Sequence, residues 1–196
     1  MPDLAALNPT SYLDQVAAAA REVDPAEVVA LADAIADAYR DNRFVYVIGN
    51  GGSGANASHL CEDLGKGTLT DFENQKRIKV LSLTDNSAYI LAWGNDTSYD
   101  RIFLEQLRSI AGSGDLLIAI SGSGNSPNVL RAVEWANDHG LRTFGTTGFD
   151  GGKLREISQQ CLHVPCNDMG IVEAVHSIFF HYLIDDLRER IRGVVA

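Results

Sequence analysis

The chain has 196 residues, of which 45% are apolar and 21% charged, and its formal net charge is −10. The length and composition are those of one globular domain over residues 1–196, and no apolar stretch approaches the ~20 residues of a membrane-spanning helix. The acidic excess and scattered basic residues are against nucleic-acid binding, which uses basic stripes. Three cysteines argue against a disulfide framework, and the acidic N-terminus does not resemble a secretion signal. We therefore expect a cytoplasmic protein that crosses no membrane.

Two predicted helices, at residues 10–21 and 26–39, open the chain and are rich in alanine and other helix formers. Short apolar or β-branched runs then predict strands buried on both faces, at residues 44–48, 78–83, 116–120, 143–146 and 162–164. Further helices are predicted at residues 54–64, 87–92, 98–110, 127–139, 153–158 and 170–190. This alternation indicates an α/β fold with a parallel sheet. An N-terminal helical pair over residues 1–41, which either covers the sheet or packs on another subunit, precedes a core over residues 42–196.

Two loops of glycine, serine and asparagine follow two of the predicted strands. They are Gly49-Asn50-Gly51-Gly52-Ser53 and Ser121-Gly122-Ser123-Gly124-Asn125-Ser126. Glycines let backbone N–H groups approach a ligand, a following helix N-terminus adds partial positive charge, and hydroxyls add directional donors. In open parallel sheets the ligand lies beyond the carboxyl ends of the strands, where both loops fall. The pair predicts a site for a sugar phosphate. Neither loop is a complete dinucleotide or Walker motif, so we expect no nucleotide cofactor.

Histidine and carboxylate residues recur at helical spacing in two predicted helices. His59 and Asp63 are four residues apart, and Glu173 and His181 are eight apart, so each pair shares a helix face. Such a set suits zinc or another divalent metal, and it equally suits proton transfer beside a carbonyl. The alternatives are a surface hydrogen bond for His59 and Asp63 and a packed core position for His181.

A further polar pair, Asn95 and Asp96, follows an apolar helical stretch. These two residues either bind substrate hydroxyls or cap the helix predicted to start near residue 98.

Taken together, these motifs resemble the sugar isomerase (SIS) domain family, most closely its phosphoheptose isomerase branch. The resemblance covers nearly the whole chain and rests on the two loops, Gly94-Asn95-Asp96, the glycine turn at residues 147–152 and the final Glu173, His176 and His181 helix. It implies a flavodoxin-like three-layer fold with a five-stranded parallel sheet, a homotetramer and active sites at subunit interfaces. It also implies interconversion of sedoheptulose 7-phosphate and D-glycero-D-manno-heptose 7-phosphate through an enediol, often with bound zinc.

Position by position, the resemblance assigns roles to individual residues. It implies phosphate binding by the hydroxyls of Ser53, Ser121, Ser123 and Ser126. It implies sugar contacts from Asn50, Gly51, Gly52, Asn95 and Asp96, with Gly122 and Glu173 also in the substrate site. His59 and His181 match metal-binding histidines, and His181 also matches the catalytic acid or base.

Three positions depart from the family pattern. Asp63 replaces the family's catalytic glutamate, Glu173 replaces a glutamine, and Gly122 stands where many members have threonine. The shorter Asp63 withdraws its oxygens, and a displacement on the order of 1 Å can lower a rate ~100-fold. The base is therefore Asp63 or Glu173, and the metal set comprises His59, Asp63, Glu173 and His181.

The sequence thus predicts an aldose–ketose isomerase acting on a sugar phosphate. Two alternatives remain at this point. One is a non-catalytic SIS module that binds sugar phosphates or proteins. The other is an isomerase for a different heptulose or octulose phosphate.

Overall fold

A five-stranded, entirely parallel sheet forms the centre of the computed structural model, which describes residues 8–194. Its strands are β1 Phe44–Gly49, β2 Lys79–Ser82, β3 Leu116–Ser121, β4 Arg142–Thr147 and β5 Gln160–His163. They lie in the order β2-β1-β3-β4-β5. This is the flavodoxin-like order, whose topological switch point falls between β1 and β3. The predicted fold class and all five predicted strands are confirmed.

The register of the strands brings the two glycine–serine loops together. Gly49, the last residue of β1, pairs with Ile120 near the end of β3, and Ser121 pairs with Thr147 at the end of β4. The loops after β1 and β3 therefore leave the same edge of the sheet on either side of the switch point. This is where open α/β sheets bind ligands.

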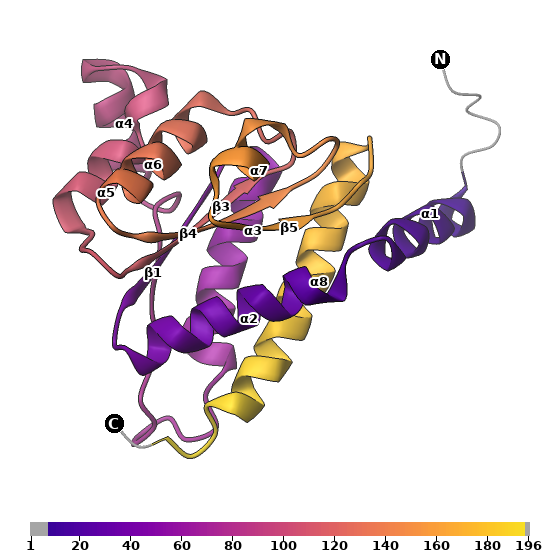
Figure 1. Cartoon of the computed structure of the whole chain (residues 1–196), viewed down its shortest axis with the longest axis horizontal. Helices are drawn as coiled ribbons and strands as arrows, with labels where there is room; N and C mark the ends of the chain where they lie inside the picture. Colours follow the sequence, from indigo (N-terminus) through magenta and orange to yellow (C-terminus); the bar gives the residue numbers. More distant parts are fainter. Residues whose placement is uncertain (1–7, 195–196) are drawn as a thin grey trace.

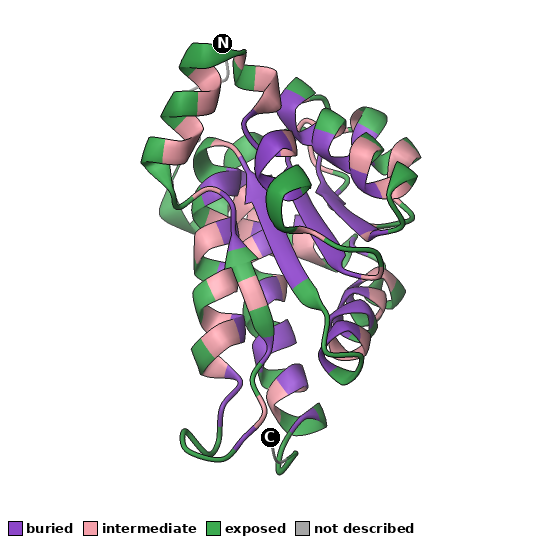
Figure 2. Ribbon diagram, turned by 90° about the vertical axis from the view of Figure 1, so that its left-hand side faces the viewer, coloured by how far each residue is buried: buried purple, intermediate pink, exposed green. Residues whose placement is uncertain are grey.

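Alternating side chains along each strand build a hydrophobic core on both faces of the sheet. Val45 and Val47 of β1 join the core under helices α2 (Pro25–Arg40) and α8 (Met169–Arg190). Tyr46 and Ile48 join the core under α5 (Leu104–Ile110) and α6 (Pro127–Asp138). Figure 2 shows the buried strands between helices whose outward surfaces are exposed. Burial on both faces explains why the strands read as continuous apolar runs.

The helices form the outer two layers (Figure 1). They are α1 Pro9–Arg21, α2 Pro25–Arg40, α3 Gly51–Glu62, α4 Ser87–Asp96, α5 Leu104–Ile110, α6 Pro127–Asp138, α7 Gly152–Ile157 and α8 Met169–Arg190. Helix α2 packs across the sheet and α8, while α1 extends away from the body and is mostly exposed. Helix α2 therefore covers the sheet, which is one of the two alternatives predicted for the N-terminal helical pair. None of the helices in the described part of the chain combines the length and apolarity that a membrane crossing requires.

Three predicted helices differ from the structure. The helix predicted at residues 87–92 continues to Asp96 in α4. Helix α3 begins at Gly51 instead of residue 54, so the first glycine-rich motif forms its opening turn, and the helix continues into a π-helical turn, Asp63–Gly67. The segment predicted as one helix over residues 98–110 is broken into a 3₁₀ turn, Tyr99–Arg101, and α5. The break turns the side chains of this segment toward α3 and α6, as described below.

Candidate active site

A cavity of ≈270 Å³ lies at the switch point and joins both glycine–serine loops. It is lined by Asn50, Gly51, Gly52, Ser53, Ile120, Ser121, Gly122, Ser123, Ser126, Met169 and Glu173. The structure therefore brings together nine of the residues that the sequence predicted as a substrate site. Met169, at the start of α8, is a lining residue that sequence reasoning missed, since a methionine at a helix start carries no chemical signal.

The second loop presents its hydroxyls around a tight turn. Gly124 has a φ of +65°, and its N–H donates to the carbonyl of Ser121 at 2.9 Å. Ser121 Oγ lies 3.3 Å from Ser126 Oγ, and Ser126 is the N-cap of α6 without making a side-chain capping bond. The loop therefore places hydroxyls beside the partially positive N-terminus of α6, which suits an anion.

The carboxylate of Glu173 closes the cavity against the first turn of α3. A Cβ on Gly52 would lie 2.1 Å from Glu173 Oε2, so the missing side chain provides the space for the carboxylate. The backbone also ties the two helices together, because Asn56 Nδ2 donates to the Glu173 carbonyl at 3.0 Å. Glu173 is thereby held in the same cavity as the serines.

A separate cluster joins the C-terminal end of α3 to the middle of α8. Asp63 Oδ2 lies 3.4 Å from His59 Nε2 and 3.8 Å from His181 Nε2, and one donor atom from each of the three residues lies within 4.8 Å of the others. The rings of His59 and His181 meet edge to face at 5.0 Å. Asp63 opens the π-helical turn, an irregularity that often marks a functional site.

The donors of this cluster fit a zinc ion. Ligands in a tetrahedral zinc site lie about 3.4 Å apart, which matches the His59–Asp63 separation closely and the His181–Asp63 separation nearly as well. Both histidine side chains are about half exposed. His181 is therefore not the packed core residue of the alternative reading.

The fully buried histidine of α8 is His176. Its Nε2 lies 3.2 Å from the Thr147 carbonyl, and burial lowers the pKa of its imidazole to about 4.

The structure divides the four residues predicted as one metal set. Among residues 8–194, the metal-compatible group contains His59, Asp63 and His181 but not Glu173. Glu173 and His181 are eight residues apart in α8, a rise of about 12 Å. Within one chain, Glu173 thus belongs to the serine cavity, while the other three residues form their own cluster.

Asn95 and Asp96 lie elsewhere. They form the exposed C-terminal turn of α4, where Asn95 Nδ2 donates to Asp96 Oδ1 at 2.9 Å. In the described part of the chain they are not among the residues that line the serine cavity. They also do not cap a helix at residue 98, because the 3₁₀ turn that follows has no side-chain cap bond.

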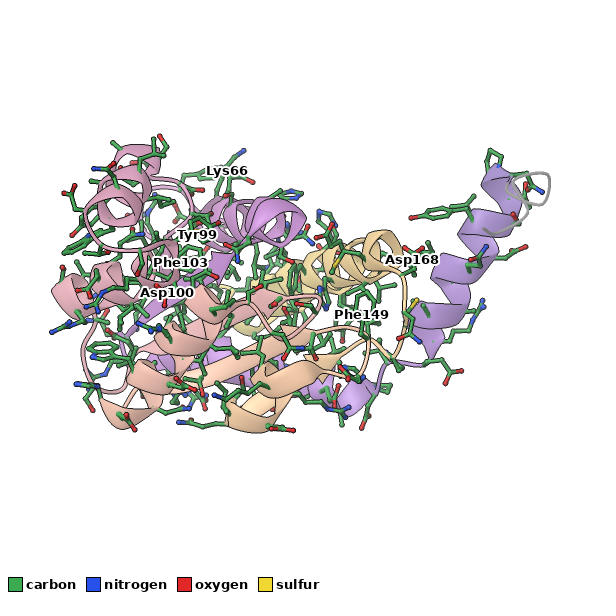
Figure 3. All side chains as sticks on the ribbon, turned by 90° about the horizontal axis from the view of Figure 1, so that it is seen from above. Lys66, Tyr99, Asp100, Phe103, Phe149 and Asp168 are labelled. Carbon is green, nitrogen blue, oxygen red and sulfur yellow. The ribbon has the colours of Figure 1, made fainter. Side chains whose placement is uncertain are left out.

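A second cavity of ≈300 Å³ lies on the other side of Asn50 and Gly51. Tyr99 and Phe103, which lie together beside α3 (Figure 3), line it with Ser58 and Thr84. Sequence reasoning missed this wall because it comes from the broken segment between α4 and α5. Asn50 separates the two cavities and contacts Asn128, another residue without a local sequence signal.

Comparison with known proteins agrees with this geometry. The SIS domain model matches residues 11–148. A phosphoheptose isomerase of Geotalea daltonii is 36% identical over 174 residues, 88% of this chain and 88% of that protein. One of Aliarcobacter butzleri is 41% identical over 70% of this chain and 71% of its own length. The structure of a phosphoheptose isomerase from Francisella tularensis superposes with a TM-score of 0.85 at 28% identity, covering 92% of this chain and 96% of that chain.

This similarity extends over most of the chain and includes the fold that places the two loops at the switch point. The chain therefore belongs to the SIS domain family, within its phosphoheptose isomerase branch of aldose–ketose isomerases.

Proposed function

We propose that this chain interconverts sedoheptulose 7-phosphate and D-glycero-D-manno-heptose 7-phosphate. The observation that carries the proposal is the cavity that unites both glycine–serine loops with Glu173, in a chain similar to phosphoheptose isomerases. We also propose a cytoplasmic location, as expected for an enzyme that acts on sugar phosphates. No nucleotide cofactor is needed, because isomerisation moves hydrogen within one molecule.

In this proposal the loops hold the phosphate. Ser121, Ser123 and Ser126 donate hydrogen bonds from their hydroxyls, and Ser53 adds another from the first turn of α3. The N-termini of α3 and α6 add partial positive charge. The neutral donors explain how a chain of net charge −10 binds an anion. Asn50, Gly51, Gly52 and Gly122 form the remaining wall beside the sugar.

Proton transfer is assigned to Glu173 and His181. Glu173 is the carboxylate that lines the substrate cavity, so we propose it as the base that removes the proton from the carbon next to the carbonyl and returns it to the adjacent carbon. With no metal in the cluster, His181 moves the oxygen-bound proton, donating it to the carbonyl oxygen and accepting one from the neighbouring hydroxyl. Asp63 then orients the imidazoles, and its contact with both histidines supports this role.

His59, Asp63 and His181 are the residues that would hold zinc, with the fourth position open. When bound, zinc would act as a Lewis acid toward a substrate oxygen.

Self-association supplies the contact that one chain lacks. Glu173 and His181 lie two helical turns apart, and Ile178 and Tyr182 beside His181 are about half exposed although both are large and apolar. We propose a homotetramer in which the exposed edge of α8 in one subunit meets the serine cavity of another, giving interfacial active sites. Asn95 and Asp96 are proposed to reach the sugar in the same assembly.

Isotope exchange tests the reaction. With sedoheptulose 7-phosphate in deuterium oxide, we expect label at carbon 1 or 2 and formation of the aldose. His181→Ala should abolish exchange while binding persists. Tight binding by the wild type without any exchange, for this or other seven- and eight-carbon ketose phosphates, would instead support the non-catalytic binding module. Turnover of another ketose phosphate alone would correct the substrate.

Mixing inactive variants tests the shared site. Glu173→Gln and His181→Ala chains are refolded together and assayed. If sites combine residues of two subunits, about one quarter of the sites regain both groups by random mixing. If the mixture stays as inactive as its components while forming the same oligomer, the site lies within one subunit.

A further inference from the structure

We infer that Asn128 is a positioning residue that holds the Asn50 amide away from the N-terminus of α3, leaving that N-terminus open to substrate. The inference rests on the proposed function and adds a residue to it. Asn128 lies in the first turn of α6, is 1% exposed, and is not itself among the residues that line the serine cavity. It acts through Asn50.

The two amides form a reciprocal pair across the switch point. Asn50 Nδ2 donates to Asn128 Oδ1 at 2.9 Å, and Asn128 Nδ2 donates to Asn50 Oδ1 at 2.8 Å. The Tyr99 hydroxyl also donates to Asn50 Oδ1, at 3.1 Å. Both lone pairs of Asn50 Oδ1 are therefore occupied.

A backbone group sets the direction of the whole network. The N–H of Val129 donates to Asn128 Oδ1 at 3.0 Å, and a backbone N–H can only donate. Asn128 Oδ1 is thus the acceptor side of that amide, so its Nδ2 must face Asn50 Oδ1. Rotating either amide would place two donors against each other, and the orientation of Asn50 is fixed as a result.

The consequence appears at the start of α3. Asn50 is the N-cap residue, yet its side chain makes no capping bond. Asn86, the N-cap of α4, behaves in the usual way and accepts from the Tyr89 N–H at 3.1 Å. Since Asn50 Oδ1 is already engaged, the free N–H groups in the first turn of α3 remain available to an anion.

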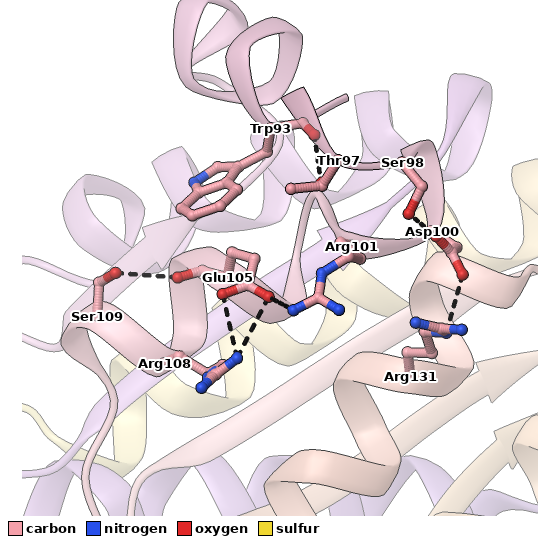
Figure 4. A network of polar contacts seen from close by, with 9 residues as sticks. All are labelled: Trp93, Thr97, Ser98, Asp100, Arg101, Glu105, Arg108, Ser109 and Arg131. Carbon is pink, nitrogen blue, oxygen red and sulfur yellow. Dashed lines mark hydrogen bonds and ion pairs between the residues drawn. The ribbon is translucent and has the colours of Figure 1, made fainter. Parts of the chain in front are cut away.

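The Tyr99 segment is itself attached to α6. Asp100 Oδ2 lies 2.9 Å from Arg131 Nε, one helical turn beyond Asn128. Ser98 donates to Asp100, and Arg101 pairs with Glu105 of α5 (Figure 4). Helix α6 therefore holds Asn50 twice, directly through Asn128 and indirectly through Tyr99, and it keeps the two substrate loops in register.

The test compares ligand binding with stability. In Asn128→Ala the Asn50 amide keeps only its bond from the Tyr99 hydroxyl, so it can rotate, cap α3 and compete with the phosphate. We expect the Kd for sedoheptulose 7-phosphate, measured by calorimetry, to rise about tenfold, with KM rising in proportion and kcat changing less than about threefold. Tyr99→Phe removes one donor from an exposed side chain and cannot endanger folding. It should raise Kd in the same direction by about two- to fivefold.

Asn137→Ala is the matched control. Asn137 lies at the other end of α6, where its amide donates to the Ile157 carbonyl and accepts from Thr143. It should lower the melting temperature and leave Kd unchanged. If Asn128→Ala lowers stability but keeps the wild-type Kd, the inference is overturned. Inorganic phosphate is titrated into the same variants as a second ligand. The Asn128→Ala variant should bind phosphate more weakly than the wild type, and this comparison holds even if the wild type does not use the heptulose.

Discussion

The carboxylate of Glu173 lies in the space that a side chain at residue 52 would fill, with 2.1 Å between Glu173 Oε2 and an ideal Cβ on Gly52. These residues are far apart in the chain, yet the α3–α8 contact makes them one feature of the cavity. The glycine is therefore required for the position of the carboxylate, whereas its backbone, which does not have a positive φ, would accept alanine.

This contact predicts that Gly52→Ala separates stability from activity. Alanine favours a helix over glycine by about 1 kcal/mol, and the flexible Glu173 side chain can rotate aside. The variant should be at least as stable as the wild type, while kcat falls about 100-fold because the carboxylate is displaced by about 1 Å or more. Thermal melts and steady-state kinetics check both halves. Gly65→Ala is the control, since its Cβ would make an ordinary contact of 3.6 Å with Val80. Full activity in Gly52→Ala would remove Glu173 from the proposed role.

Gly122 and Met169 form a second complementary pair. A Cβ on Gly122 would lie 2.3 Å from Met169 Sδ, so the methionine fills the space of the threonine expected from the family resemblance. Gly122→Thr should force the Met169 side chain out of its present rotamer, and because Met169 is 39% exposed and can move aside, we expect a loss of only about 0.5–1.5 kcal/mol. Most of that loss should disappear in the Met169→Ala background. A double-mutant cycle by denaturant unfolding measures the coupling, and additive effects would contradict the predicted overlap.

The division of the predicted metal set has a direct consequence for zinc content. His59→Ala and His181→Ala should each lower the affinity for zinc at least about tenfold, because each removes one of three ligands. The zinc bound per chain should fall accordingly. Glu173→Gln should bind as much zinc as the wild type. His139→Ala, the control, should do so too, because the exposed imidazole of His139 contacts Trp135 and not the cluster. Elemental analysis after dialysis against a chelator distinguishes these results. An equal loss of zinc in Glu173→Gln would show that Glu173 belongs to the metal site with His59, Asp63 and His181.

The buried histidines predict how stability depends on pH. Burial lowers the pKa of His176 from 6.5 to about 4, and it lowers the pKa of His163 as well. Between these values the unfolded chain binds protons that the folded chain does not, so unfolding becomes easier as the pH falls. The melting temperature should stay constant above about pH 6.5 and decrease as the pH falls from there toward about pH 4. His176→Leu should show a shallower decrease than the wild type. An equal slope in that variant would assign the effect to other groups.

Much of the fold could be predicted from local patterns. Apolar runs such as residues 116–120 identify strands that are buried on both faces, and Pro127 identifies the start of α6. The start of α3 was predicted three residues late, because glycines within a helix look like a loop until the backbone is seen. The segment at residues 98–110 was predicted as one helix because its composition does not reveal the break after Arg101.

The sequence by itself determined the kinds of chemistry available: hydroxyls and glycines after two strands, and imidazoles and carboxylates at helical spacing in two helices. The tertiary structure alone decided which of these groups meet. Strand order placed the two loops at one switch point. Helix packing brought Glu173 to the serines and His181 to His59 and Asp63, and a long-range amide pair holds the Asn50 side chain away from the start of α3. Local sequence dictates backbone conformation over a few residues, but contacts between distant residues depend on how whole elements pack, and that is where this site is assembled.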